Sequence, residues 1–168
     1  MKNIVLIGMP GAGKSTVGVL LAKTLGRKFI DTDLLVQEET GRLLQEIIDS
    51  DGPDAFMAVE EKTVISLHRH RAVIATGGSV VYSRKAMARF KEHGVVVYLQ
   101  VSYDEVVKRL KNVTTRGIVL HPGQDLRALY DERVPLYEQY ADLTVDCTGG
   151  HFEECVGKIV DGLKRYGA

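Results

Sequence analysis

The sequence lacks an excess of charge of either sign, since lysine plus arginine and aspartate plus glutamate both number 22. Proteins that bind nucleic acids or acidic membranes more often carry a basic excess, so we expect neither partner. Apolar runs near the roughly 18 residues that span a bilayer are also lacking. The apolar run at residues 3–8 leads directly into a glycine-rich segment with no small-residue cleavage site, so we expect no signal peptide.

Cysteine is scarce, and its two copies, Cys147 and Cys155, do not have the spacing of metal ligands. We therefore predict free thiols, a reducing compartment and a cytoplasmic protein. Internal repeats, low-complexity tracts and interdomain linkers are absent from the sequence. A length of 168 residues with 45% apolar content favours one domain, residues 1–168, with an ample core. We expect a monomer whose partner is a small molecule.

Short apolar runs alternate with helical patterns along the chain. The predicted strands are Ile4–Ile7, Lys28–Ile30, Val73–Ala75, Val95–Leu99 and Leu143–Val145. The segments with helical spacing are residues 17–25, 54–68, 105–110, 126–140 and 151–166. This alternation predicts an α/β protein with a parallel sheet covered on both faces. Ligands of such sheets bind beyond the carboxyl ends of the strands, so functional residues are sought there.

The segment after the first predicted strand matches G-x-x-x-x-G-K-S from Gly8 to Ser15, the pattern of a P-loop. Its glycines let main-chain N–H groups converge on an anion, and the following helix adds its partial positive charge. Lys14 would reach the outer phosphates of a nucleotide, and the Ser15 hydroxyl would hold Mg²⁺. The alternative is an ordinary strand-turn-helix corner. The predicted nucleotide-binding residues here are Gly11, Ala12, Gly13, Lys14, Ser15 and Thr16.

Two carboxylates, Asp31 and Asp33, follow the second predicted strand. Two residues apart in an extended segment, they point the same way, so one could hold a metal and the other an acceptor hydroxyl. The alternative is that Asp33 caps the helix that begins at Leu34. The third predicted strand ends without an acidic residue, which makes Asp31 the better candidate for the metal.

Two further segments are candidates. Gly77 and Gly78 could bring N–H groups close to a ligand, or form a tight turn before a helix. The polar stretch 109–124 could fold over the nucleotide and bring Arg116 to the transferred phosphate, or be a solvated surface loop. Arg133 lies within a predicted helix beside Pro135, where it could also be a surface charge at a kink.

Taken together, GMPGAGKST at residues 8–16, Asp31-Thr32-Asp33, Gly77-Gly78 and RVPLYEQYAD at residues 133–142 resemble the shikimate kinases over nearly the whole chain. The resemblance implies a three-layer fold of the P-loop NTPase and nucleoside-monophosphate-kinase type, with a five-stranded parallel sheet flanked by helices. It also implies a lid around residues 110–123 and phosphoryl transfer from ATP, with Mg²⁺, to one hydroxyl of shikimate. By position it assigns catalysis to Lys14, Asp33 and Arg116, nucleotide contact to Arg109, metal binding to Ser15 and Asp31, and acceptor binding to Asp33, Met57, Gly77, Gly78 and Arg133.

The chain departs from the family pattern in the acceptor region. Met57 stands where the family has an arginine that clamps the acceptor carboxylate, and methionine supplies neither charge nor orientation. Ser79 replaces a third glycine, and Gly117 replaces the proline after the lid arginine. Shikimate is the expected acceptor, and another polyol or hydroxy acid is the alternative.

Two functions of other classes are weighed against a kinase. A GTPase needs Asp-x-x-Gly after its third strand and Asn-Lys-x-Asp for guanine. The Asp-x-x-Gly at residues 49–52 lies before Pro53, and Asn-Lys-x-Asp does not occur. An inactive relative that only binds ATP would show nucleotide affinity without turnover.

Overall fold

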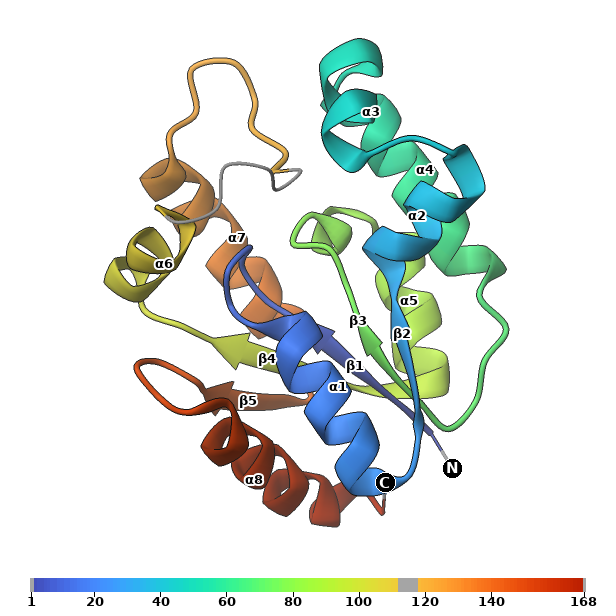
Figure 1. Ribbon diagram of the computed structural model, residues 1–168, viewed down its shortest axis with the longest axis vertical. Coiled ribbons are helices and arrows are strands. Elements are labelled where there is room, and N and C mark those ends of the chain that lie inside the picture. Colours follow the sequence, from blue (N-terminus) through green and yellow to red (C-terminus); the bar gives the residue numbers. More distant parts are fainter. Residues whose placement is uncertain (1, 112–117, 168) are drawn as a thin grey trace.

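The computed structural model describes residues 2–111 and 118–167, in which five strands form one parallel sheet (Figure 1). The strands are β1 (Asn3–Ile7), β2 (Lys28–Asp31), β3 (Ala72–Ala75), β4 (Gly94–Gln100) and β5 (Leu143–Asp146), in the spatial order β2-β3-β1-β4-β5. The α-helices are α1 (Lys14–Leu25), α2 (Thr32–Thr40), α3 (Leu44–Asp51), α4 (Pro53–Ser66), α5 (Arg84–His93), α6 (Tyr103–Leu110), α7 (Leu126–Tyr140) and α8 (Phe152–Leu163). Two 3-10 turns, η1 (Val80–Tyr82) and η2 (Lys164–Tyr166), complete the described elements.

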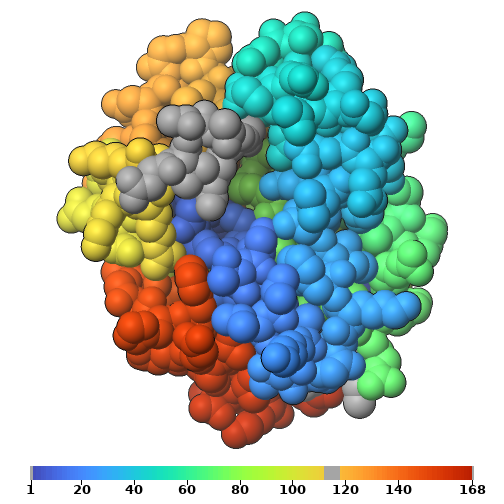
Figure 2. Space-filling model, viewed as in Figure 1, coloured from blue at the N-terminus to red at the C-terminus, as the bar shows by residue number. Residues whose placement is uncertain are grey.

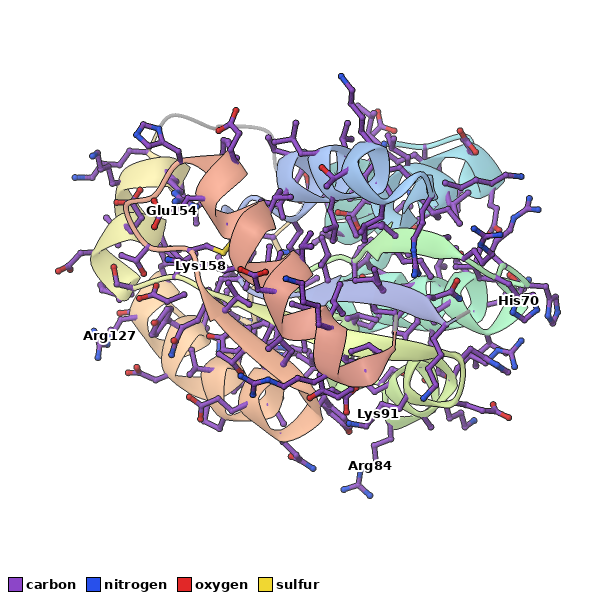
Figure 3. All side chains as sticks on the ribbon, turned by 90° about the horizontal axis from the view of Figure 1, so that it is seen from below. His70, Arg84, Lys91, Arg127, Glu154 and Lys158 are labelled. Atoms are coloured by element: carbon purple, nitrogen blue, oxygen red, sulfur yellow. A yellow bond between two sulfur atoms is a disulfide. The ribbon has the colours of Figure 1, made fainter. Side chains whose placement is uncertain are left out.

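Helices cover both faces of the sheet, as the alternation of elements predicted. The helices α1 and α8 pack together on one face, and α5 and α7 lie on the other (Figures 1 and 3). The central strand β1 is wholly buried between them. All five predicted strands are confirmed, and each is one or two residues longer than its apolar run. The expected three-layer α/β fold is therefore correct.

Two helical boundaries follow from local chemistry. The helix α4 begins at Pro53, where the fixed φ of proline suits a first turn, directly after Gly52 at φ 89°. The helix α2 begins at Thr32, and its cap is Asp31, whose side chain accepts from the N–H groups of Asp33 and Leu34. The alternative reading of Asp33 as the cap is therefore wrong, because the cap lies two residues earlier. The strand β2 ends at Asp31 and α2 begins at the next residue.

The register of the sheet brings the candidate residues to one edge. Ala75 of β3 pairs with Asp31 on one side and with Leu6 on the other. The segments that follow β1, β2 and β3 therefore leave the sheet side by side, as expected for the carboxyl ends of parallel strands. None of the described helices is both long and apolar enough to cross a membrane.

Candidate active site

The segment between β1 and α1 has the shape of an anion cradle. Gly8, Gly11 and Gly13 all have positive φ, and Gly13 caps α1 without any side-chain hydrogen bond. The first N–H groups of α1 are therefore presented at its amino end, where the helix favours negative charge. Lys14 is nearly buried, and its Nζ donates to the carbonyls of Gly8 at 2.7 Å and Met9 at 2.8 Å. These contacts hold the ammonium group over the loop that would surround a polyphosphate.

Ser15 and Asp31, the two predicted metal residues, are in direct contact. The Ser15 hydroxyl donates to Asp31 Oδ2 at 2.7 Å, while Asp31 Oδ1 accepts from the N–H of Asp33 at 2.9 Å. A hydroxyl and a carboxylate form a hard oxygen donor set of the kind that Mg²⁺ takes together with phosphate oxygens and water. In the described part of the chain, no three His, Cys, Asp or Glu side chains gather into a metal site. Ser15 and Asp31 would supply two oxygen ligands, and the oxygens of a bound nucleotide and water would supply the others.

A cavity of about 580 Å³ extends from the cradle toward α2 and α4. Figure 2 shows its opening between the dark blue amino-terminal segment and the lighter blue and cyan of α2 and α3 (Figure 2). Lys14, Ser15 and Thr16 line one end, and Asp33, Gly77, Gly78 and Arg133 line the other. Residues from four separate segments of the sequence thus meet around one space, as the motifs predicted.

Arg133 is a buried cation in the wall of the cavity. It is 1% exposed, its Nη2 donates to the Val119 carbonyl at 3.0 Å, and its guanidinium lies over the Tyr82 ring at 5.3 Å. A Cβ on Gly78 would stand 2.8 Å from Arg133 Nη1, so only glycine leaves room there for the guanidinium. The alternative reading of Arg133 as a surface charge is therefore wrong.

Glu60, which the sequence analysis did not select, is the second carboxylate of the cavity. It is 2% exposed, and its Oε1 accepts from the Ser79 hydroxyl at 2.8 Å. Its Oε2 is buried and has no hydrogen-bond partner within the described residues. Burial, together with the charge of Asp33, raises the pKa of Glu60 to about 7. Its position four residues after Phe56 on the buried face of α4 was the available signal.

Met57 lies outside this cavity, although its position predicted contact with the acceptor. Its side chain packs at the edge of a small apolar cluster formed by Val36, Ile47, Phe56 and Val119. Met57 is not among the described residues that line the cavity. The apolar side chain thus joins the packing between α2, α3 and α4.

Arg109 contacts the outside of the cradle. Its Nη1 donates to the carbonyls of Gly11 at 3.2 Å and Ala12 at 3.3 Å, and its Nη2 donates to Cys147 O at 3.2 Å. Glu105, one turn earlier on α6, pairs with its Nε at 2.9 Å. Arg109 therefore ties α6 and the segment after β5 to the phosphate loop, beside the place expected for the nucleotide base.

The prediction of free thiols is wrong, because Cys147 and Cys155 form a disulfide. Cys147 follows β5 and Cys155 lies in the first turns of α8, and a tight turn through Gly149 at φ 61° brings their Cα atoms to 5.4 Å. That separation is within the usual range for a disulfide. The yellow bond beside α8 in Figure 3 marks it (Figure 3). A spacing of eight residues could not reveal the pairing, because it depends on the turn.

Arg116, the predicted lid arginine, and its neighbour Gly117 lie outside the described residues. Of the predicted lid at 110–123, the structure describes residues 110–111 and 118–123. Val119 contributes to both the cavity wall and the bond to Arg133. The predicted role of Arg116 therefore stays a prediction.

The raised pKa of Glu60 makes the stability of the fold depend on pH. The unfolded carboxyl titrates at its ordinary pKa of 4.5, and the folded one at about 7. Between these values the unfolded chain has lost a proton that the folded chain keeps, so the free energy of unfolding falls as pH rises. A glutamine does not titrate. From pH 4 to pH 8, the stability of Glu60→Gln relative to wild type should rise by about 3 kcal/mol.

Urea denaturation at the two pH values measures this difference. Glu61→Gln is the matched control, because Glu61 is the adjacent carboxylate on α4 and accepts instead from the Ser83 hydroxyl. An equal stability difference between wild type and Glu60→Gln at pH 4 and pH 8 would contradict the prediction.

A family model described as shikimate kinase matches residues 10–164. The shikimate kinase of Thermodesulfovibrio yellowstonii is 40% identical over 168 residues, covering 98% of this chain and 96% of that protein. The shikimate kinase of Thermobifida fusca is 39% identical and covers 97% and 95%.

Solved structures give the same result. Shikimate kinase from Acinetobacter baumannii in complex with shikimate has a TM-score of 0.91 and 31% identity, with 99% of this chain and 94% of that chain covered. A gluconokinase from Sinorhizobium meliloti, at 20% identity and a TM-score of 0.56 over 98% and 93%, shares the fold.

Proposed function

This chain belongs to the shikimate kinase family, and we propose that it moves the terminal phosphoryl group of ATP to one hydroxyl of shikimate, with the residue roles set out below. The observation that carries the proposal is the single cavity of about 580 Å³ that joins the phosphate cradle to Asp33 and Arg133. A donor phosphate and an acceptor alcohol can meet in it without crossing protein. Such positioning supplies much of the rate enhancement of phosphoryl transfer.

The nucleotide end acts through charge. Main-chain N–H groups of residues 11–16 bind the phosphates, and Lys14 offsets the charge that grows on the transferred group. Ser15 and Asp31 would hold Mg²⁺, which supplies further positive charge at the outer phosphates when bound. The hydrogen bond between Ser15 and Asp31 supports this pairing, because it already fixes both oxygens on one side of the cradle.

The acceptor end acts through orientation. Asp33 holds the attacking hydroxyl, and Arg133 binds the carboxylate of shikimate from the opposite wall. Gly77 and Gly78 leave the space between them open, since a Cβ at either would stand within 3 Å of the Asp33 or Arg133 side chain. Arg116 would reach the transferred phosphate as the lid closes and water is excluded.

Release of ADP from ATP and Mg²⁺ is the direct test, measured with shikimate and with a panel of cyclic and linear polyols and hydroxy acids. Turnover with shikimate above every other compound is the expected result. Faster turnover of another polyol or hydroxy acid would favour the alternative acceptor. ATP affinity without turnover of any compound would overturn the proposal.

Residue 57 gives a prediction on specificity. Because Met57 packs outside the cavity, Met57→Arg should change the KM for shikimate by no more than about threefold, which corresponds to less than 1 kcal/mol. Steady-state kinetics beside Met57→Leu, a control that keeps the apolar contact, measures the change. A tenfold or larger gain in shikimate affinity would show that position 57 reaches the acceptor and that the pocket has diverged from shikimate.

The remaining expectations belong to the same proposal. We expect a single kinase domain over residues 1–168, a monomer, and a cytoplasmic protein without nucleic-acid or membrane partners. The disulfide removes the argument for a reducing compartment that the predicted free thiols gave, so the expected cytoplasmic location depends on the predicted lack of a signal peptide and on the family.

A further inference from the structure

Two carboxylates converge on Gly77 from different helices. A Cβ placed on Gly77 would stand 2.5 Å from Glu60 Oε2 of α4 and 2.8 Å from Asp33 Oδ1 of α2. Both oxygens therefore lie next to the same glycine, at the end of the cavity that receives the acceptor. The glycine makes this approach possible, because any side chain would collide with one or both of them.

The surroundings of Glu60 favour its protonated form. The carboxyl is fully buried, and the negative charge of Asp33 faces it. Lys14 from α1 and Arg133 from α7 act in the opposite direction, as does the hydrogen bond from Ser79. Tyr137, whose hydroxyl donates to the Gly78 carbonyl at 2.7 Å, also faces this site. The balance leaves Glu60 with a pKa of about 7, where a group can gain or lose a proton under working conditions.

Ser79 determines which oxygen of Glu60 faces the cavity. Ser79 is 4% exposed and its hydroxyl donates to Oε1, so that Oε2 is the oxygen beside Gly77 and Asp33. This Oε2 is buried and unpartnered within the described residues, which is costly unless a donor reaches it during the reaction. Ser79 is also one of the positions at which this chain departs from the family pattern.

We propose that Glu60 is the group that finally takes up the proton lost by the acceptor hydroxyl, and that Ser79 positions its Oε2 for this task. The inference rests on the proposed kinase function. The O–H bond of the acceptor breaks as its oxygen bonds to phosphorus, and the bond from phosphorus to ADP breaks with its electron pair leaving on ADP. The proton passes to Glu60 Oε2, from which it is released to solvent with the products.

The pH dependence of kcat/KM for shikimate, at saturating ATP and Mg²⁺, tests the inference. Wild type should lose activity below about pH 7, because protonated Glu60 cannot accept a proton. This fall of kcat/KM at low pH is the acidic limb of the profile. Ser79→Ala removes a hydrogen bond that stabilises the charged form of Glu60, so the acidic limb should move up by about one pH unit. Glu60→Gln should lower the pH-independent maximum of kcat/KM about a hundredfold and abolish the limb near pH 7.

Glu61→Gln is the matched control, because Glu61 lies on the same helix outside the cavity and should leave the limb in place. Infrared difference spectra of the protein without substrate give an independent readout. A protonated-carboxyl band should disappear near pH 7 in wild type and Glu61→Gln and be missing in Glu60→Gln.

These measurements separate this inference from the kinase proposal. A limb that survives in Glu60→Gln, or a wild-type spectrum without a carboxyl that titrates near pH 7, would overturn the role of Glu60 even if shikimate is turned over normally. Absence of turnover beside a normal infrared titration would overturn the kinase proposal instead. If Glu60→Gln does not fold, the direction of the Ser79→Ala shift decides, because a limb that stays in place contradicts the inference.

Discussion

Lys14→Met should lower kcat about 10²- to 10³-fold while the KM for shikimate changes little. The ammonium group is held over the phosphate loop by two carbonyls, so its charge is already in place when the phosphoryl group begins to move. Methionine has a similar length but no charge. The variant therefore loses the stabilisation that the ammonium group gives to the transition state, and this loss should appear in kcat. Steady-state ADP release measures the effect.

Lys23→Met is the matched control for this variant, because Lys23 is an exposed lysine in the last turn of the same helix. Its kinetics should equal those of wild type. Thermal melting of both variants checks the fold. Wild-type kcat in a folded Lys14→Met protein would remove Lys14 from the chemistry and leave the P-loop as a binding element only.

Arg133→Met should raise the KM for shikimate by about 30-fold to several thousand-fold, the range for losing one partner of a desolvated carboxylate. Arg133 is buried in the wall of the acceptor end, and Met57 lies outside the cavity. No second arginine among the described residues lines this space. Arg133→Lys keeps the charge but loses the planar guanidinium, so its KM for shikimate should lie between those of wild type and Arg133→Met.

Arg127→Met controls for changes in α7 itself. Arg127 is an exposed arginine on this helix that pairs with Asp131 and lies over the Tyr103 ring. ATP affinity, measured by titration calorimetry, should be unchanged in all three variants. An unaltered shikimate KM in a folded Arg133→Met protein would contradict the assigned role.

The fold was predictable to the extent that each element carries its own pattern. The strands β1 and β4 are continuous apolar runs because both faces of the sheet are covered, and such runs are visible without any tertiary knowledge. The helix α7 was predicted with its observed bounds, because its helical spacing continues through Pro135. The short helices α2 and α3 were less visible, since each buries few residues and packs mainly against other helices.

The site was predictable where one local segment makes it. The phosphate cradle is a single stretch from Gly8 to Ser15, so its spacing alone identified it. Glu60 and Arg133 acquire their properties from other segments: Asp33 and Ser79 face Glu60, and Val119 and Tyr82 hold Arg133. The raised pKa of Glu60 and the burial of Arg133 arise only when the chain is folded, which is why the surface reading of Arg133 failed.

The bond between Cys147 and Cys155 joins the segment after β5 to α8 on the phosphate-loop side of the molecule. Arg109, which also contacts the phosphate loop, donates a hydrogen bond to the carbonyl of Cys147. The acceptor end, around Asp33 and Arg133, contains neither of the chain's two cysteines. Reduction by dithiothreitol in a purification buffer would therefore free the segment after β5 beside the phosphate loop, and it would break no bond at the acceptor end. Nucleotide affinities should accordingly be compared between samples handled with the same thiol reagents.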